Sequence, residues 1–253
     1  MQNEISIAFI QTDLIWKNKQ ANLSLIEKQI LSITEDVDII VLPEMFTTAF
    51  CIDDMSLAED INGETITWLK HLAKHKNVAV CGSILFKENE NYYNRFLFVE
   101  ANGNIHHYNK HHLFSLVGED KNLTKGTEKI LIDYKGWKIQ PFICYDIRFP
   151  GWCANDDDAD IQIYVANWPK KRIHHWKLLL QARAIENQCY TIGVNRIGND
   201  FYENEHNGCS AIFDFAGNQM KMLENTFGTE IVKLSKDDLE KYKERYPFWK
   251  DRL

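Results

Sequence analysis

The order of its apolar segments constrains the fold of this chain most strongly, because runs of strand length alternate with segments of helical spacing. Residues 4–14 (EISIAFIQTDL) alternate apolar and polar side chains, which predicts a strand. Apolar side chains recur every three or four positions in residues 18–33 and again in 64–76, which predicts two helices. Residues 37–46 (VDIIVLPEMF) are an apolar run between these helices, which predicts a strand covered on both faces. The alternation predicts an α/β protein of mixed sheets with helices outside.

Hairpins and a second series of strands are predicted further along the chain. Residues 77–86 and 91–100 flank a polar turn and form a predicted hairpin, and Asn102-Gly103 turns the chain into another strand. A helix is predicted over residues 172–188, through the apolar residues Trp176, Leu179, Leu180 and Ile185. The remaining predicted strands lie within residues 129–150, which turn at Lys135-Gly136, and within 159–168, 188–198, 209–220 and 228–235. Ser235 is expected to cap a last short helix. No linker interrupts this order, so we expect a single domain over residues 1–253.

Length, composition and charge exclude several classes of protein. The chain has 253 residues, of which 45% are hydrophobic, enough to bury a large core. Its net charge of -7, with both signs interspersed, gives no basic stripe for a phosphate backbone, so we expect no nucleic-acid partner. No apolar run approaches the roughly 20 residues that span a bilayer, and the N-terminus lacks the features of a signal peptide. We therefore expect a soluble, cytoplasmic protein without a membrane partner.

The six cysteines are expected to be reduced thiols. They lie at positions 51, 81, 144, 153, 189 and 209, with no C-x-x-C pair. Any one of them, taken alone, is expected to be a small core residue. A functional role for Cys144 therefore needs further support from the rest of the sequence.

Three chemically useful residues follow predicted strands. Glu44 ends the run IIVLPEMF, Lys110 ends IHHYNK, and Cys144 follows the apolar PFI. Acyl transfer needs a thiol, a base that takes its proton and a positive charge that stabilises the oxyanion, and these residues supply the three groups. Each has an ordinary alternative: a loop glutamate in water, a solvated lysine or a core cysteine. Taken together they favour a site, because ligands collect at strand ends in α/β proteins.

The histidines raise the question of a metal site. His106 and His107, His111 and His112, and the pair His71 and His75 are the candidate ligands. Adjacent histidines in a strand point to opposite faces, so these pairs do not converge on one ion. We expect no metal and no cofactor.

The motifs LPEMF, YNKHHLF and ICYDIRFP, in this order, resemble the Glu-Lys-Cys triad of the nitrilase superfamily of carbon-nitrogen hydrolases. The segments YVANWP, HWKLLLQARAIENQCYTIGVNRIG and EKYKERYPFW resemble its omega-amidase branch, which hydrolyses the terminal amide of dicarboxylic acid monoamides such as 2-oxoglutaramate, 2-oxosuccinamate and succinamate. This resemblance implies a four-layer α-β-β-α sandwich of two mixed sheets with outer helices. It also implies assembly into a homodimer or a larger homo-oligomer.

The resemblance implies a role for each residue of the site. Glu44 would be the general base, Cys144 the nucleophile that forms a thioester, and Lys110 an oxyanion donor together with the backbone N–H of Tyr145. Glu119 matches a second glutamate of the family and would be the partner of Lys110. One motif departs from the pattern, because Cys209 stands in NGCS where related amidases often have a charged residue or a histidine.

A dicarboxylic acid monoamide also needs a cation for its far carboxylate. Arg148, four residues after Cys144, is the candidate, because a guanidinium can bind a carboxylate through two hydrogen bonds. The equal alternative is an internal salt bridge of Arg148 with Asp146. Phe114 and Trp168 are candidate walls of the substrate pocket.

Three other functions stay open on sequence alone. One is an amidase or nitrilase of the same superfamily that acts on a different small amide or nitrile, for example a deaminated glutathione. Another is a papain-like protease in which Cys144 pairs with a histidine such as His112. The third is a non-catalytic binding protein on the same fold.

Overall fold

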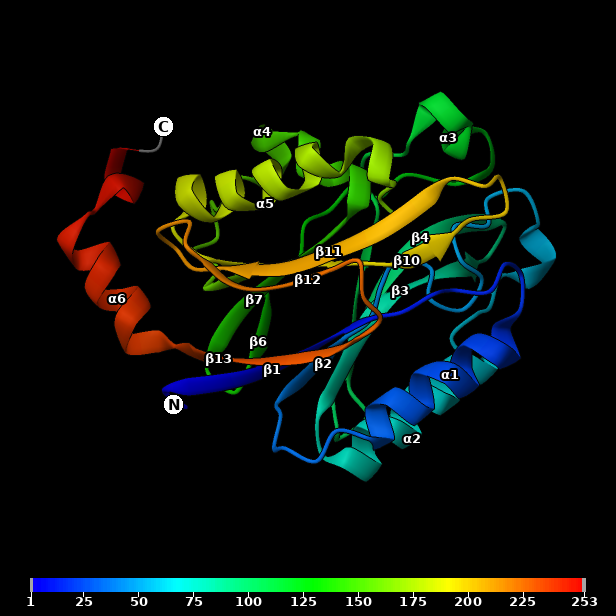
Figure 1. Cartoon of the computed structure of the whole chain (residues 1–253), viewed down its shortest axis with the longest axis horizontal. Helices are drawn as coiled ribbons and strands as arrows, with labels where there is room; N and C mark the ends of the chain where they lie inside the picture. The colour runs from blue at the N-terminus through cyan, green and yellow to red at the C-terminus, as the bar shows by residue number, and fades with distance from the viewer. Residues whose placement is uncertain (1, 252–253) are drawn as a thin grey trace.

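The computed structural model describes residues 2–251, in which two mixed β-sheets pack face to face and helices cover both outer faces (Figure 1). The first sheet has the strand order β13-β1-β2-β3-β4-β5 and the second β10-β11-β9-β8-β7-β6, with β12 paired to β11. The strands of the first sheet are β1 (Glu4–Gln11), β2 (Ile39–Val41), β3 (Ala79–Glu88), β4 (Asn91–Val99), β5 (Ile105–Asn109) and β13 (Gly228–Ser235). Those of the second are β6 (Ile132–Tyr134), β7 (Trp137–Ile143), β8 (Ile161–Ala166), β9 (Tyr190–Asn195), β10 (Ile197–Asn199), β11 (Glu205–Phe213) and β12 (Gln219–Glu224). This architecture confirms the predicted four-layer sandwich.

Each sheet is built on three parallel strands, β1-β2-β3 in the first and β7-β8-β9 in the second. Parallel neighbours need crossover connections, which here are mostly helical. The helices are α1 (Lys19–Leu31), α2 (Glu64–Lys76), α3 (Glu119–Asn122), α4 (Pro150–Cys153), α5 (Ile173–Asn187) and α6 (Lys236–Arg245). Of these, α1 joins β1 to β2, α2 joins β2 to β3, and α5 joins β8 to β9. The carboxyl ends of the parallel strands in each sheet therefore lie at one edge.

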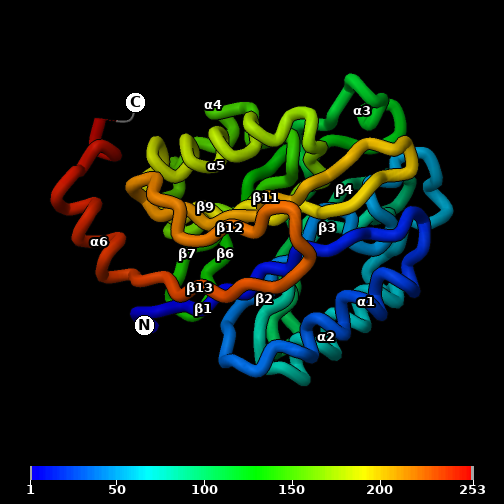
Figure 2. The backbone as a smooth tube through the Cα atoms, in the orientation of Figure 1, coloured from blue at the N-terminus to red at the C-terminus, as the bar shows by residue number. Residues whose placement is uncertain are grey.

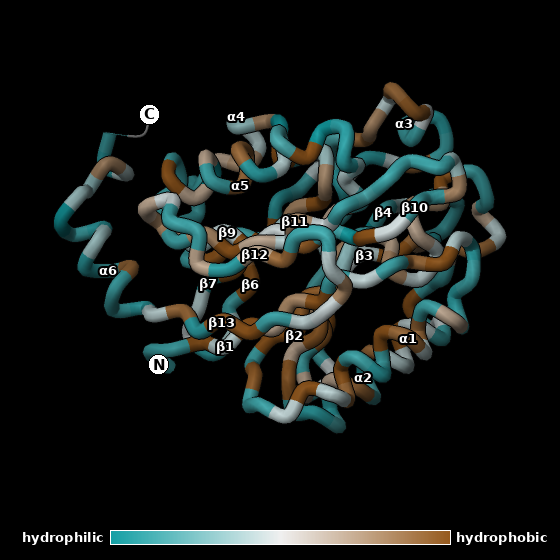
Figure 3. The backbone as a smooth tube through the Cα atoms, in the orientation of Figure 1, coloured by the Kyte–Doolittle hydropathy of each residue, from teal (hydrophilic) through white to brown (hydrophobic). Residues whose placement is uncertain are grey.

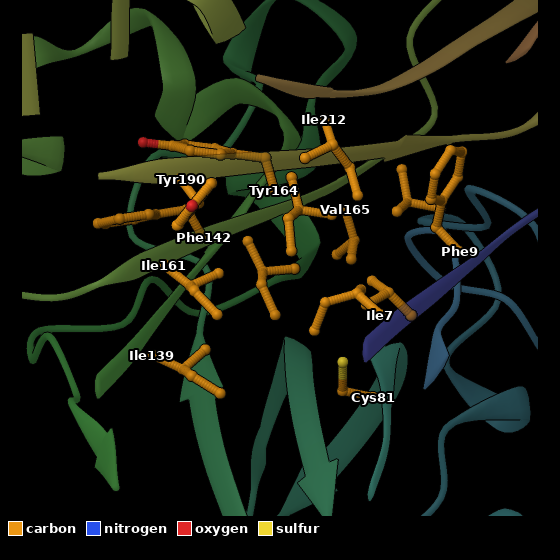
Figure 4. Packing of buried hydrophobic residues seen from close by; sticks show 14 of the residues in the cluster. Ile7, Phe9, Cys81, Ile139, Phe142, Ile161, Tyr164, Val165, Tyr190 and Ile212 are labelled. Atoms are coloured by element: carbon orange, nitrogen blue, oxygen red, sulfur yellow. The ribbon is translucent and has the colours of Figure 1, made fainter. Parts of the chain in front are cut away.

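The main core lies between the two sheets. Figure 4 shows Ile7 and Phe9 of β1 and Cys81 of β3 packed together with Ile161 and Val165 of β8. All five side chains are fully buried. A second apolar cluster lies between the first sheet and helices α1 and α2. The first sheet is thus covered on both faces, as the continuous apolar run at residues 37–46 predicted.

The outer helices form where the sequence predicted them. Helix α5 contains all four apolar residues of the helix predicted over 172–188; Trp176 and Leu180 are buried, whereas Ile185 is 50% exposed. Nine residues at about 100° each turn Ile185 half a revolution away from Trp176. Helix α6 begins as predicted, with the Ser235 hydroxyl accepting a hydrogen bond from the N–H of Asp238. It is mostly hydrophilic in Figure 3.

The strand predicted at residues 37–46 is shorter in the structure, where β2 covers only Ile39–Val41. Pro43 follows within two residues, and a proline cannot donate a hydrogen bond to a neighbouring strand.

None of the six cysteines forms a disulfide, as expected of reduced thiols. Among residues 2–251, no helix is both long and apolar enough to cross a membrane.

Candidate active site

Glu44, Lys110 and Cys144 each follow the end of a strand, and the two sheets bring these ends together. Glu44 follows β2 and Lys110 follows β5. Strand β5 is antiparallel to β4, which is antiparallel to β3, so β5 runs in the same direction as β2. Oε1 of Glu44 consequently lies 2.9 Å from Nζ of Lys110. Cys144 follows β7 in the facing sheet and lines the same cavity.

Lys110 lies between two buried carboxylates. Its Nζ donates to Oε1 of Glu44 at 2.9 Å and to both oxygens of Glu119 at 3.0 Å. Lys110 is 1% exposed, and both glutamates are fully buried. The structure therefore places Glu119 beside Lys110, where the sequence predicted a partner. The N–H of Phe114 holds Glu119 from the other side, at 2.6 Å from Oε2.

Burial and charge act in opposite directions on these groups. Burial alone would lower the pKa of Lys110, but the carboxylates of Glu119 and Glu44 outweigh it and raise that pKa well above its usual range. Burial raises the pKa of Glu119, with Glu44 adding to the effect and Lys110 opposing it. Lys110 is thus a permanent cation at any physiological pH. A fixed positive charge is what a developing oxyanion requires.

Cys144 occupies a sharp turn between β7 and a short 3-10 segment, Cys144–Arg148. Its φ of 46° lies in the left-handed region that side chains rarely adopt, and such strain is concentrated at functional sites. Burial raises the pKa of the Cys144 thiol well above its usual range, and the Glu44 carboxylate adds to this effect. Lys110 and the backbone N–H of Asn167 lower the pKa. The charged groups that act on the thiol are thus Glu44, Lys110 and Glu119, rather than an imidazole.

Asp146 connects the turn at Cys144 to the segment that follows Lys110. This fully buried carboxylate accepts hydrogen bonds from the N–H of Ile143 at 3.1 Å and from the Tyr108 hydroxyl at 2.8 Å. It also accepts from the N–H of His112 at 2.8 Å and from Nδ1 of the same residue at 3.1 Å. Four donors occupy most of the hydrogen-bonding positions of a carboxylate. Asp146 therefore holds Cys144 and Lys110 in a fixed relation, a role that the sequence did not reveal.

His111 and His112 pack against aromatic rings, and His112 also belongs to the hydrogen-bond network of Asp146. His111 and His112 lie beyond the end of β5, so their rings are not on opposite strand faces as predicted, and their centroids are 4.6 Å apart. The His111 ring stacks on Trp152, and the His112 ring stacks on Phe149 at 3.6 Å. Within residues 2–251, no group of three or more His, Cys, Asp or Glu side chains could hold a metal ion.

Two asparagines that sequence reasoning missed hold Glu44 in place. Asn94 donates from Nδ2 to Oε1 of Glu44 at 2.8 Å. Asn167 donates its backbone N–H to Oε2 of Glu44 and its Nδ2 to the Glu44 carbonyl, both at 2.7 Å. Asn167 directly follows β8, the same kind of strand-end position as Glu44 and Cys144, so the sequence carried a usable signal for it. Asn94 lies within β4 and has no such signal.

A cavity of about 420 Å³ opens onto the three predicted catalytic residues. The cavity is also lined by Phe114, Trp168 and Arg148, the three residues predicted to bind substrate, and by Tyr145. The other lining residues include Trp16, Phe50, Ile52, Leu116, Val117, Asn167, Lys171, Arg172, Asp200, Tyr202, Asn204 and His206. The cavity is therefore aromatic and cationic at once, a composition suited to a small anionic ligand.

Arg148 does not form the alternative salt bridge with Asp146. Its Nη2 donates to Nδ1 of His175 at 3.1 Å, and its guanidinium lies 4.6 Å from the ring centre of Trp168. The guanidinium of Arg172 lies over Phe114 at 5.6 Å. Among residues 2–251, neither Arg148 nor Arg172 forms a salt bridge with a carboxylate. Both charges remain available to an anion in the cavity.

Cys209, which departs from the family motif, lies away from the cavity lining. It is fully buried, and its backbone carbonyl accepts a hydrogen bond from Nε1 of Trp176 at 2.9 Å. The side-chain amide of Asn207 lies 3.5 Å from its sulfur. Cys209 is thus a packing residue at the contact between β11 and α5.

Comparisons with known proteins extend over nearly the whole chain. A model of the carbon-nitrogen hydrolase family matches residues 6–244. The omega-amidase YafV of Yersinia enterocolitica is 40% identical over 250 residues, which cover 98% of this chain and 96% of the relative. A 2-oxoglutaramate amidase of Bacillus subtilis is 36% identical over 214 residues, covering 83% and 82%. Among solved structures, XC1258 from Xanthomonas campestris, a CN-hydrolase superfamily protein with an arsenic adduct in its active site, has a TM-score of 0.97 and 32% identity and covers 100% of this chain and 98% of its own.

Proposed function

The chain belongs to the carbon-nitrogen hydrolase family, and we propose that it is an omega-amidase that releases ammonia from the terminal amide of dicarboxylic acid monoamides. The substrates are 2-oxoglutaramate, 2-oxosuccinamate and succinamate, and the products are the dicarboxylic acid and ammonia. Relatives named omega-amidase and 2-oxoglutaramate amidase support this substrate class. The single observation that carries the proposal is the cavity in which Cys144 and two arginines without salt bridges are combined.

In the first half of the reaction, Glu44 accepts the thiol proton of Cys144 as the sulfur attacks the amide carbon. Because the pKa of this thiol is raised, proton removal and attack are coupled, and the resting enzyme holds little thiolate at neutral pH. Lys110 and the backbone N–H of Tyr145 stabilise the oxyanion. Glu44 then passes its proton to the departing ammonia. The C–N bond breaks and a thioester on Cys144 remains.

In the second half, Glu44 takes a proton from water, which attacks the thioester carbon. The oxyanion forms against the same two donors, and the C–S bond breaks with the proton returning to Cys144. Glu44 is held by Asn94, Asn167 and Lys110, so its carboxylate keeps one position through both halves. Glu119 shares the charge of Lys110 and keeps the ammonium group in place.

Arg148 binds the far carboxylate of the substrate. Its guanidinium is fixed by two contacts, because His175 accepts its Nη2 hydrogen bond and the guanidinium carbon lies over the Trp168 ring. A guanidinium can only donate, so Nδ1 of His175 is the acceptor and the imidazole is neutral. Burial lowers the pKa of His175, with the charges of its neighbours adding to the effect, which favours the neutral ring. A preorganised arginine of this kind suits a carboxylate at a set distance from Cys144.

The experiment that tests this function is a panel of substrates assayed for ammonia release. The panel contains 2-oxoglutaramate, succinamate, a neutral amide, a nitrile and an N-carbamoyl compound. We expect the two acid amides to have the highest kcat/KM. A nitrile or the neutral amide that exceeds them would replace this function by the alternative amidase or nitrilase. No ammonia from any compound would favour a binding protein.

Assembly and location are part of the same proposal. We propose a homodimer or larger homo-oligomer, which light scattering on the purified protein would measure. We also propose a cytoplasmic location, which suits six cysteines that form no disulfide.

A further inference from the structure

Three aromatic side chains that the proposed reaction does not use, those of Trp16, Phe201 and Tyr202, form an aromatic wall at the mouth of the cavity. Trp16 precedes α1, whereas Phe201 and Tyr202 lie in the turn between β10 and β11. The rings of Trp16 and Phe201 stack with centroids 5.4 Å apart, and Trp16 meets Tyr202 edge-on at 6.1 Å. Figures 1 and 2 both draw these two segments at the same end of the molecule. Trp16 and Tyr202 line the cavity.

A buried arginine fastens the two segments to each other. Arg196 is 1% exposed, and its Nη2 donates to Oδ1 of Asp13 at 2.7 Å. The same nitrogen donates to the carbonyls of Leu14 and Asn199, each at 3.0 Å. A backbone hydrogen bond from Ile197 to Thr12, at 3.1 Å, joins the segments next to this arginine. Both sides of the aromatic wall are therefore anchored.

The turn that carries Tyr202 is itself ordered by hydrogen bonds. Oδ1 of Asp200 accepts from the backbone N–H groups of Tyr202 and Asn204, both at 2.9 Å. Despite this order, Phe201 is 62% exposed and Tyr202 is 66% exposed. Leu116 and Val117, which also line the cavity, are exposed as well. A preorganised, exposed apolar surface beside a cavity is a feature of ligand-binding sites.

The cations of the cavity determine how a substrate meets this wall. Arg148 and Arg172 draw an anionic group toward them, and the positive charge of Arg172 acts on Arg148. A substrate whose amide is at Cys144 and whose carboxylate is at Arg148 has both ends fixed. A substituent on the carbon beside that carboxylate is then the part that can extend toward the mouth. A cavity of about 420 Å³ is in the size range of drug-sized ligands, larger than a five-carbon monoamide requires.

We propose that Trp16 and Tyr202 form a second subsite that binds an aromatic or apolar substituent on the carbon beside the far carboxylate of an omega-amide. This inference rests on the proposed function and extends its substrate class. The ligands it predicts are glutamine-type acids whose α-nitrogen carries an aromatic acyl group. The reaction is the same hydrolysis: the terminal C–N bond breaks, a C–O bond to water forms, ammonia leaves, and the acyl substituent is unchanged.

Three omega-amides test the subsite: glutaramate without a substituent, N-acetylglutamine with a small one, and N-(phenylacetyl)glutamine with an aromatic one. We expect kcat/KM for the phenylacetyl compound to exceed that for the acetyl compound by about tenfold, the order of effect that a buried aromatic contact gives. Tyr202→Ala should remove most of this preference, and Tyr202→Phe, which keeps the ring, should retain it. Phe227→Ala is the matched control, because Phe227 is also an exposed aromatic but does not line the cavity.

The outcomes separate this inference from the function on which it rests. Suppose that the wild type hydrolyses glutaramate but does not hydrolyse the phenylacetyl compound in preference to the acetyl compound. If the phenylacetyl compound is also no tighter an inhibitor than the acetyl compound, the second subsite is refuted and the proposed function stands. If the preference persists in Tyr202→Ala and in Trp16→Ala, the subsite lies elsewhere and the inference is also refuted. If none of the three compounds is hydrolysed or bound, the proposed function fails together with it.

Discussion

Replacing His112 by phenylalanine should slow catalysis even though His112 does not line the cavity. Phenylalanine keeps the stacking on Phe149, where the ring centroids are 3.6 Å apart, but removes the Nδ1 donor to Asp146 at 3.1 Å. Asp146 is fully buried and keeps three of its four donors. Because Asp146 connects the turn at Cys144 to the segment after Lys110, the loss shifts one catalytic residue relative to the other.

The size of the effect follows from the strength of that one hydrogen bond. A hydrogen bond to a charged group contributes about 1.5–3 kcal/mol, so the free energy of unfolding of His112→Phe should fall by about this amount. In a chain of this length the Tm would fall by roughly 3–12 °C. A displacement of about 1 Å at a catalytic site can cost on the order of 100-fold, so we expect kcat to fall by about 10- to 100-fold. KM should change by less than about threefold, because His112 does not contact the proposed substrate.

The assay compares steady-state kinetics on 2-oxoglutaramate with the rate of Cys144 alkylation by iodoacetamide. His112→Asn, whose amide nitrogen can replace Nδ1 as the donor, should recover most of the activity. His111→Phe is the matched control: it keeps a ring to stack on Trp152 and loses a hydrogen bond to the Gly126 carbonyl instead. Equal losses of kcat in His112→Phe and His111→Phe, or no recovery in His112→Asn, would refute the positioning role of this network.

Three further predictions concern the charged groups of the site. Arg148→Met should raise KM for succinamate about 10- to 100-fold while changing KM for butanamide far less, since only succinamate has a far carboxylate; equal increases in steady-state assays would contradict the carboxylate role. Because burial raises the pKa of the Cys144 thiol, the rate of its alkylation, followed by intact mass, should keep rising with pH beyond about 9.5, roughly one unit above the usual thiol pKa, where the rate for an unperturbed thiol levels off; a plateau near neutral pH would show a stable thiolate instead. Lys110→Met leaves two buried carboxylates without their cation, so the free energy of unfolding should fall by about 3–5 kcal/mol in urea titrations, and a change below about 1 kcal/mol would indicate that water already reaches these groups.

The periodicity of the sequence predicted the outer helices and the strands that carry the site. Helix α2 begins and ends at the predicted residues, and β13 coincides with its predicted run. The apolar residues of α5 did not by themselves reveal its buried face, because Ile185 lies half a revolution from Trp176 and is exposed. Strand β2 was predicted too long, since the apolar run continues past the last residue that pairs with both neighbours.

The candidate site was predictable only where each residue is chemically distinctive at a strand end. Glu44, Lys110 and Cys144 fit that description, and the structure brings Glu44 and Lys110 into contact. Asp146 was considered as a salt-bridge partner of Arg148, but its four hydrogen bonds come from backbone and side chains up to 38 residues away. Such contacts depend on how two strands and a turn meet, and no local pattern encodes them. The aromatic wall was missed for the same reason, because Trp16 and Phe201 belong to segments far apart in sequence.

The central claim is that Cys144 is the nucleophile, and ammonia release from 2-oxoglutaramate by Cys144→Ala tests it most directly. The side chain is small, so the variant should fold, and its Tm should confirm this before the assay. We expect no release above the rate without enzyme, together with loss of the acyl-enzyme mass that acid quenching of the wild type should reveal. Retention of more than about one hundredth of the wild-type kcat would contradict the account, because Glu44, Lys110 and Glu119 alone cannot form a thioester.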